Sequence, residues 1–315
     1  MRAYAVDEFG ADGSVREIPI PEPGDGEVLV AVRAAGVNAM DPLFVIGAYK
    51  DYMDHRLPLT PGIDLAGVVE RVGPGVDGFA PGDAVYGVSA RPFVGTGTFA
   101  EYVAVAVGDV SPKPASLSFT EAASVPHAAL TALAAIEAAD PQPGQTVVVV
   151  GATGGVGSFV TQMAAARGAR VVAVSATPGV ALSSELGATE TIDHEAVDVG
   201  STLRTRYPAG VDTLITMYGD VETVTGMAQS VRTGGLVVSP AMRADAVSST
   251  FEKLGVTFTG VSRLSPARLP ELTTLLDAGK LRVPPVTAFQ LERAGDAIGE
   301  MATGHVRGKL VIAIS

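Results

Sequence analysis

Two patterns of hydrophobic and polar residues follow one another along the chain. Up to Ser118, short apolar runs rich in Val alternate with turns rich in Gly and Pro. The apolar runs predict strands over residues 27–32, 65–72, 84–88 and 99–107. Many short strands separated by such turns are typical of a mostly antiparallel, barrel-like β domain.

Beyond Ser118 the pattern changes. Residues 120–139 are rich in Ala and Leu and predict one helix. Further on, apolar runs alternate with helical segments. The runs predict strands over 146–150, 171–174, 213–216, 236–239 and 256–261, and two of the segments predict helices over 155–167 and 178–186. Continuous apolar strands that alternate with helices predict a doubly wound parallel sheet.

The last part of the chain predicts helices over 269–278 and 293–303 and a strand over 308–314. This closing strand could return to the first domain, which would make the parallel-sheet domain an insertion. We therefore predict an α/β protein of two domains. The β-rich domain comprises residues 1–122 and 264–315, and the doubly wound domain comprises residues 123–263.

Composition narrows the function classes. The 315 residues carry a net charge of −12, which disfavours a nucleic-acid partner because it would repel a phosphate backbone. The absence of cysteine excludes disulfides, iron–sulfur clusters, thiol catalysis and cysteine-bound zinc, and the four histidines are too scattered to suggest a metal site. Without an apolar leader or a run of membrane-spanning length, we expect a cytoplasmic protein with no membrane partner.

The segment VVVVGATGGVG (147–157) is a buried strand that leads into a glycine turn and a helix. Against the dinucleotide-binding pattern G-x-G-x-x-G, Ala152, Gly154 and Gly157 take the glycine positions. Gly154 would let the backbone approach a pyrophosphate, Gly157 would let the helix pack on the strand, and free N–H groups would bind the phosphates. The alternative is a purely structural turn. We predict that a dinucleotide is bound by Ala152, Gly154, Gly155, Val156 and Gly157.

The strand after this turn bears on the choice of dinucleotide. NAD sites usually carry Asp or Glu at its end, where the carboxylate binds the adenosine ribose. No acidic residue occurs over 171–177, which predicts NADPH, with the 2′-phosphate held by the hydroxyls of Ser175 and Thr177 and helped by Arg167 or Arg170. No Lys or Arg follows as far as residue 203, so the usual phosphate clamp is missing, and the two hydroxyls could instead cap the next helix.

Several motifs occur in an order that is similar to one family. They are GVNAMD (36–41), PGIDLAGVV (61–69), VGPGV (72–76), GDAV (82–85), GTFAEY (97–102), LTA (130–132), the glycine turn and GKLV (308–311). By these motifs the chain is identified as a member of the medium-chain dehydrogenase/reductase superfamily, and it resembles the zinc-free NADPH:quinone oxidoreductase branch. The resemblance implies a GroES-like catalytic domain, an inserted Rossmann domain with the active cleft between them, and hydride transfer from NADPH.

Zinc-dependent relatives carry Cys, then His-Glu, where this chain has Asn38 and Ile63-Asp64. The resemblance therefore implies no metal site. Without a Lewis acid to stabilise an alkoxide, a simple alcohol is a poor substrate. A quinone or an α,β-unsaturated carbonyl compound suits better, because hydrogen-bond donors suffice to polarise its conjugated carbonyl.

The resemblance also implies roles for residues of the first domain and of the following helix. Asn38 matches the family's Asn beside the nicotinamide, as a ligand of ribose or substrate, or is a turn residue. Asp41 would cap a helix or act as an acid, and Thr131 would face the nicotinamide or pack between helices. Where the family often has Tyr-Ile-Arg-Ser-Gly-x-Tyr, this chain has Leu43 to Tyr49. Tyr49 is the expected proton donor, or packs on its loop, and the lost polar residues indicate a bulkier, apolar acceptor.

Further positions are expected near the cofactor. Tyr218 would stack on cofactor or substrate, or fill the cleft. His194 stands where the family has a cofactor-contacting Tyr, and could add positive charge near the adenosine phosphate or be solvated. Ser239 and Ser262 end the fifth and sixth strands of the sheet and would line the nicotinamide pocket. Lys309 would approach the cofactor or lie at the surface.

We therefore predict a zinc-independent oxidoreductase that transfers a hydride from NADPH to a small apolar quinone or carbonyl substrate, with Asn38, Tyr49 and Tyr218 as catalytic residues. An enoyl reductase or tailoring enzyme of a biosynthetic pathway is a related alternative. A non-catalytic NADPH-binding sensor or scaffold is an alternative of another class. The strand over 256–261 would lie at the sheet edge, and because an open edge can pair with another chain, it predicts a homodimer of the kind common in the family.

Overall fold

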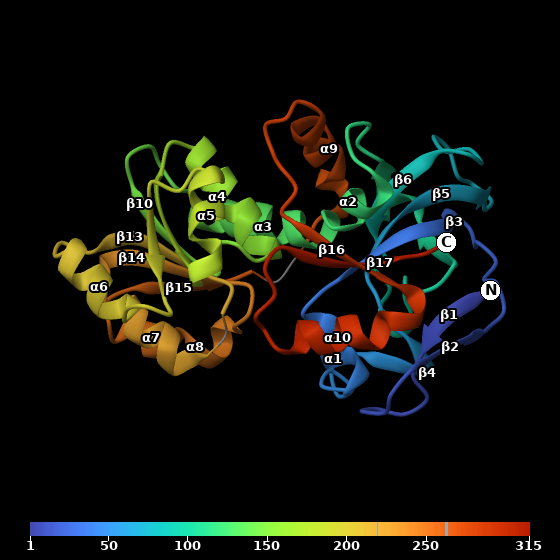
Figure 1. Cartoon of the computed structure of the whole chain (residues 1–315), viewed down its shortest axis with the longest axis horizontal. Coiled ribbons are helices and arrows are strands. Elements are labelled where there is room, and N and C mark those ends of the chain that lie inside the picture. The colour runs from blue at the N-terminus through green and yellow to red at the C-terminus, as the bar shows by residue number, and fades with distance from the viewer. Residues whose placement is uncertain (219, 262–263) are drawn as a thin grey trace. The chain divides into compact units, whose positions relative to one another are not determined.

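The structure is a computed structural model that describes residues 1–218, 220–261 and 264–315 (Figure 1). It divides into two compact units. Unit 1 comprises Met1–Leu130 and Ser265–Ser315, and unit 2 comprises Thr131–Leu264. The first division falls inside helix α3 (Pro126–Ala139), and the domain limits that the sequence suggests, at 122/123 and 263/264, stay a prediction.

Unit 1 is built mainly of strands. Its strands are β1 (Arg2–Ala5), β2 (Ser14–Glu17), β3 (Glu27–Val37), β4 (Asp54–Thr60), β5 (Asp64–Val72), β6 (Ala84–Val88), β7 (Phe93–Thr96), β8 (Tyr102–Ala106), β9 (Val110–Pro112), β16 (Val286–Gln290) and β17 (Lys309–Ala313). Its helices are α1 (Met40–Val45), α2 (Phe119–Ala123), α9 (Leu269–Asp277) and α10 (Ala294–Ala302), with short 3₁₀ turns η1 (Val107–Asp109), η3 (Pro266–Arg268) and η4 (Leu291–Arg293).

The main sheet of unit 1 runs in the order β16-β17-β3-β5-β6-β9, and β8 pairs with β3. The closing strand β17 lies antiparallel to β3, with Leu310 opposite Val37. The predicted return of the chain end to the first domain is therefore confirmed. Unit 2 is inserted in the sequence between Leu130 and Ser265 of unit 1. β3 is almost wholly buried because its Val- and Ala-rich residues face the core on one side and packed strands or helices on the other.

Unit 2 is a parallel sheet covered by helices. Its elements are β10 (Thr146–Val150), α4 (Gly155–Ala166), β11 (Arg170–Ser175), η2 (Thr177–Gly179), α5 (Val180–Glu185), β12 (Glu190–Asp193), α6 (Val199–Arg206), β13 (Val211–Thr216), α7 (Val221–Ala228), β14 (Val231–Ser239), α8 (Ala244–Glu252) and β15 (Thr257–Gly260). The strand order is β12-β11-β10-β13-β14-β15, which is the Rossmann order. In Figure 1, α4 and α5 cover one face of the sheet, and α6, α7 and α8 cover the other. The predicted sheet edge at residues 256–261 is confirmed, because β15 is the last strand.

One predicted helix is wrong. The segment 120–139 forms two helices, α2 and α3, which are separated at Ser124 and Val125. The cause is Pro126, which has no N–H to donate and whose ring cannot follow a helical turn. α2 begins with a capping box in which Ser118 and Glu121 bond each other's backbone N–H groups. Within the residues that the structure describes, no helix is long and apolar enough to cross a membrane.

Candidate functional site

The glycine turn of unit 2 joins β10 to α4. Gly154 is the N-cap of α4, and Gly151 has a left-handed φ of 78°. A Cβ at Gly157 would lie 2.0 Å from the Gly151 carbonyl oxygen, so only glycine lets α4 pack on the turn. Ala152 is buried and donates its N–H to the Val174 carbonyl over 3.1 Å.

The start of α4 remains accessible. Gly154, Gly155 and Val156 are only half-buried. The first-turn N–H groups of any helix have no acceptor inside the helix. An anion placed at this point would meet these donors and the positive end of the helix dipole. The tight turn and its accessible N–H groups therefore fit the pyrophosphate of a dinucleotide.

Other predicted residues lie at the carboxyl edge of the same sheet. Val150 is paired with Thr216, so β10 and β13 end side by side. Tyr218 follows β13 and is 54% exposed, and its N–H donates to the Thr216 hydroxyl over 3.1 Å. Ser239 ends β14 and is fully buried, with its hydroxyl accepting from the Ala241 N–H. The sheet thus brings the glycine turn, Tyr218 and Ser239 to one edge. Thr131 is buried in α3, and Ser262 lies outside the described residues.

The two hydroxyls predicted at a 2′-phosphate are not free for it. Ser175 is 2% exposed, and its hydroxyl lies 3.4 Å from the Ser183 hydroxyl. Thr177 is exposed, but its hydroxyl donates to Asp193 Oδ2 over 2.6 Å. Both hydroxyls are therefore engaged within unit 2.

The two arginines suggested as helpers are engaged elsewhere. Arg167 Nη1 lies 3.2 Å from Asp140 Oδ1, and Arg170 pairs with Glu190. His194 is exposed, and its backbone N–H donates to the Ser175 carbonyl over 3.1 Å. Of the predicted positive groups, only His194 lies beside the end of β11.

In unit 1, Asn38 belongs to a buried polar cluster that the sequence did not reveal. Asn38 is 5% exposed, and its Nδ2 donates to Asp64 Oδ2 over 3.0 Å. Its Oδ1 accepts from Lys309 Nζ over 2.7 Å. Lys309 is 3% exposed, also donates to the Val37 carbonyl, and lies 3.6 Å from Asp64 Oδ2. Lys309 is therefore not the surface residue that one interpretation predicted.

Asp41 and His127 complete this cluster. Asp41 is fully buried and accepts from the N–H groups of Asn38 and Gly62, at 2.7 and 3.0 Å, so it does not cap α1. Burial raises the pKa of Asp41 to about 7, against the opposing effects of the Asn38 N–H and the Lys309 charge. The backbone N–H of His127 donates to Asp64 Oδ1. Burial lowers the pKa of the His127 ring. With Asp41 protonated, one ammonium balances one carboxylate.

Tyr49 and the segment before it form a separate part of unit 1. Tyr49 is half-buried and meets the Phe44 ring edge-on at 5.7 Å. Phe44 packs with Leu59 and Val94. Ile46 is 58% exposed, so the segment presents the apolar surface that its sequence predicted.

A zinc ion does not fit the described residues. They contain no group of three or more His, Cys, Asp or Glu side chains that could hold a metal ion. The positions of Asn38 and Asp64 are occupied by an amide and a carboxylate that already share the Lys309 ammonium.

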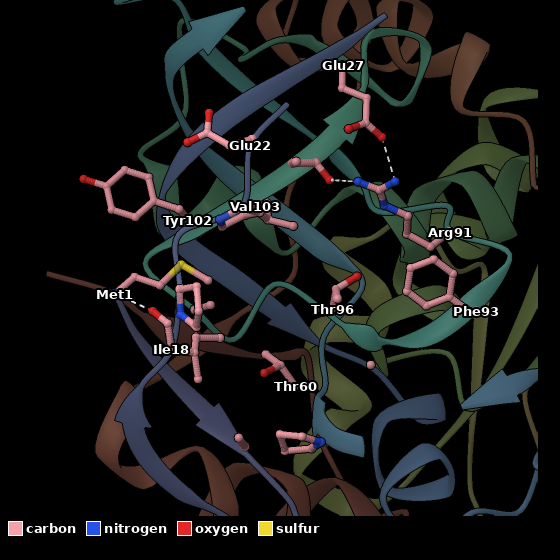
Figure 2. A pocket seen from close by; sticks show the side chains of 18 residues that line it. Met1, Ile18, Glu22, Glu27, Thr60, Arg91, Phe93, Thr96, Tyr102 and Val103 are labelled. Carbon is pink, nitrogen blue, oxygen red and sulfur yellow. Dashed lines mark hydrogen bonds and ion pairs between the residues drawn. The ribbon is translucent and has the colours of Figure 1, made fainter. Parts of the chain in front are cut away.

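A cavity of about 440 Å³ lies in unit 1 (Figure 2). None of the predicted site residues lines it. Arg91 reaches across its rim, where Nη1 pairs with Glu27 at 2.6 Å and Nη2 donates to the Ala104 carbonyl. Thr60 and Thr96 line another part of it, and Phe93 lies beside Arg91, as Figure 2 shows.

Comparison with known proteins agrees with this architecture. Residues 24–115 match the family described as alcohol dehydrogenase GroES-like domain, and residues 186–312 match the one described as zinc-binding dehydrogenase. The chain is 32% identical to 2-methylene-furan-3-one reductase of Solanum lycopersicum, over 99% of this chain and 79% of the relative. It is 31% identical to the quinone oxidoreductase of Sus scrofa, over 98% and 95%.

Among solved structures, the quinone oxidoreductase from Coxiella burnetii superposes with a TM-score of 0.89 at 29% identity, covering 100% of this chain and 99% of that one. The likeness thus extends over the GroES-like unit, the inserted Rossmann unit and the closing strand. On this basis the chain belongs to the medium-chain dehydrogenase/reductase superfamily, in its quinone oxidoreductase branch, and is an oxidoreductase that uses a nicotinamide cofactor.

Proposed function

We propose that the protein reduces a quinone or an α,β-unsaturated carbonyl compound without zinc, using a reduced nicotinamide dinucleotide. The observation that carries the proposal is the glycine turn, where Gly157 lets α4 pack against Gly151 and leaves the first N–H groups of the helix accessible. These groups, with Ala152, Gly154, Gly155 and Val156 around them, would bind the pyrophosphate.

The chain's own residues would position the reactants and move a proton. The reduced nicotinamide supplies a hydride, which brings two electrons to the acceptor. Tyr49, or water, would then supply the proton that completes the reduction. Asn38 would be held in one orientation by Asp64 and Lys309, and its second amide hydrogen, which makes a long bond of 3.5 Å to the Gly36 carbonyl, would turn to ribose or substrate. Tyr218 would line the nicotinamide end at the carboxyl edge of the sheet, and the buried Ser239 would support the loop after β14 through its bond from the Ala241 N–H.

Two observations support a quinone or an α,β-unsaturated carbonyl compound as the acceptor. One relative is named for the reduction of a furanone and another as a quinone oxidoreductase. In this chain, Ile46 exposes an apolar side chain at the segment where the family often has polar residues. An apolar rim favours a larger apolar acceptor, which keeps the related alternative, a tailoring enoyl reductase, within the test.

The finer choice of reductant has only sequence support. The absence of an acidic residue over 171–177 predicts NADPH. The carboxylates of Asp193 and Glu195, at the end of β12, oppose the binding of a 2′-phosphate, and NADPH therefore stays a prediction. A homodimer through the open edge of β15 and a cytoplasmic location also stay predictions.

The first experiment is to follow the loss of reduced-nicotinamide absorbance with NADH and NADPH separately, against a panel of quinones and enones. Turnover with either acceptor class supports the proposal. Tight binding of the dinucleotide without turnover of any acceptor would instead favour a sensor or scaffold.

A matched pair of variants tests whether the glycine turn binds the dinucleotide. Gly157→Ala places a methyl group against the Gly151 carbonyl and is expected to weaken dinucleotide binding by about tenfold or more, which is ~1.4 kcal/mol. Gly226→Ala makes the same change in α7, where a Cβ meets nothing within 4 Å, and should leave binding unchanged. Equal effects of the two variants would contradict the assignment of the turn.

A further inference from the structure

The end of β12 lies directly beside the end of β11. The two strands are parallel, with Ser175 opposite Asp193, and the His194 N–H donates to the Ser175 carbonyl. In Rossmann domains, the residues that follow the second strand face the adenosine ribose of the dinucleotide. Here that strand is β11, so the residues that follow β12 are neighbours of the ribose position.

Two carboxylates meet at Thr177, in the segment that follows β11. The Thr177 hydroxyl donates to Asp193 Oδ2 over 2.6 Å, and the Thr177 N–H donates to Glu195 Oε2 over 3.0 Å. The Glu195 N–H in turn donates to Asp193 Oδ1 over 3.0 Å. These bonds fix both acidic side chains against the segment that would read the ribose.

The two carboxylates lie at the surface of unit 2. The hydrogen bond from Thr177 lowers the pKa of Asp193 below its usual value, helped by the Glu195 N–H and the nearby His194. Glu195 is exposed. The end of β12 therefore carries negative charge at the place where NADP sites carry positive charge.

Little positive charge offsets it. The sequence has no Lys or Arg over 171–203, and Arg170 sits at the other end of β11, roughly 17 Å away along the strand, where it pairs with Glu190. Of the side chains over 171–203, only the His194 imidazole can carry a positive charge. A 2′-phosphate, which adds about 1.5 to 2 negative charges, would meet two carboxylates and no Lys or Arg from the segment 171–203.

We propose that Asp193 and Glu195 determine the cofactor preference of this site by disfavouring a 2′-phosphate, so that the protein binds NADH more tightly than NADPH. The proposal rests on the proposed function for the use of a nicotinamide dinucleotide. The free lone pairs of Asp193 can accept from a ribose hydroxyl, as the carboxylate at the end of the second strand does in other NAD sites. In this chain the carboxylate comes from Asp193, at the end of β12, which is the third strand of the Rossmann domain along the chain.

Binding measurements test this directly. The Kd values of NADH and NADPH, and of the fragments AMP and adenosine 2′,5′-bisphosphate, are measured by isothermal titration calorimetry at low and high salt. We expect NADH to bind about tenfold or more tightly than NADPH, with the fragments in the same order. The ratio should shrink at high salt because exposed charges are screened. A protein that binds NADPH as tightly as NADH, or more tightly, overturns the proposal.

Variants assign the preference to the two residues. Glu195→Arg should reduce or reverse the preference for NADH, measured as the ratio of the NADPH and NADH Kd values. Glu195→Gln and Asp193→Asn should reduce this preference, and circular dichroism checks that each variant folds. Glu252→Arg makes the same charge change at the end of α8, which packs on the opposite edge strand β15, and should leave the ratio unchanged. A ratio insensitive to Glu195→Arg and Glu195→Gln also overturns the proposal.

The outcome separates this inference from the proposed function. A clear preference for NADH without turnover of any acceptor supports the inference and contradicts the proposed catalysis. Turnover with a preference for NADPH does the reverse. The absence of any dinucleotide binding overturns both.

Discussion

Replacing Lys309 by Met tests whether the buried cluster of unit 1 is a real source of stability. The variant keeps the length and apolar stem of the side chain and removes one buried charge. In the native chain, the ammonium bonds Asn38 and Val37 and lies 3.6 Å from Asp64, which is fully buried. At that distance and an effective dielectric constant of about 20, the attraction is roughly 4 to 5 kcal/mol.

Removing one partner of such a pair leaves the other charge buried and unbalanced, which typically costs about 3 to 5 kcal/mol. We therefore expect Lys309→Met to lower the free energy of unfolding by about that amount. Urea unfolding followed by circular dichroism would show a midpoint that is lower by about 2 M. Adding Asp64→Asn to Lys309→Met should recover part of the loss, because it removes the unbalanced carboxylate.

The control is Lys280→Met, which removes an exposed Lys of the same unit and should change the free energy of unfolding by no more than about 0.5 kcal/mol. A loss below about 1 kcal/mol for Lys309→Met would refute the reasoning. So would a double variant with Asp64→Asn whose loss equals the sum of the two single losses, because the two residues would then be independent.

Three further outcomes are expected. Burial raises the pKa of Asp41 from 3.8 to about 7, so between these pH values the folded chain holds this proton while the unfolded chain releases it. The contribution of Asp41 to stability therefore falls as the pH rises through this window. The free energy of unfolding, measured in urea between about pH 4 and pH 8, should depend less on pH in Asp41→Asn than in the native protein. Ser118→Ala breaks the capping box of α2 and should cost about 1 kcal/mol in the same assay, whereas Ser184→Ala, at an exposed position inside α5, should cost less. Tyr49→Phe should lower kcat by about 10²-fold with the Kd of the dinucleotide unchanged, and an unchanged kcat would remove Tyr49 from the mechanism.

The parallel sheet could be predicted wherever its strands are continuous apolar runs. β10 has the predicted limits, and β11, β13 and β14 contain the predicted ranges, because Val-rich segments buried on both faces carry a strong local signal. β12 was not predicted. Its sequence ETID has one buried residue, Ile192, and its strand state depends on pairing with β11.

The burial of Lys309 and the placement of Asp193, which the sequence did not reveal, have the same cause. Lys309 follows Gly308 at the start of an apolar strand, and a Lys there is usually exposed. Its burial is explained only by Asp64 and Asn38, which come from other segments of the chain. The placement of Asp193 likewise depends on strand register, which no local pattern specifies. The glycine turn was predictable because its function depends on backbone geometry that only a short run of glycines permits.

The two groups of charges differ in a way that separates their effects. In unit 1, Lys309 and Asp64 are buried and balance each other, so removing one should destabilise the fold. In unit 2, Asp193 and Glu195 lie at the surface with little positive charge beside them, so changing them should alter which ligand binds and cost little stability. Lys309→Met should therefore lower the urea midpoint and leave the ratio of NADH to NADPH affinities unchanged. Glu195→Arg should change that ratio and leave the free energy of unfolding within about 0.5 kcal/mol of that of the native protein. If either variant moved both quantities, charge would not act locally at that position, and its assigned role would be wrong.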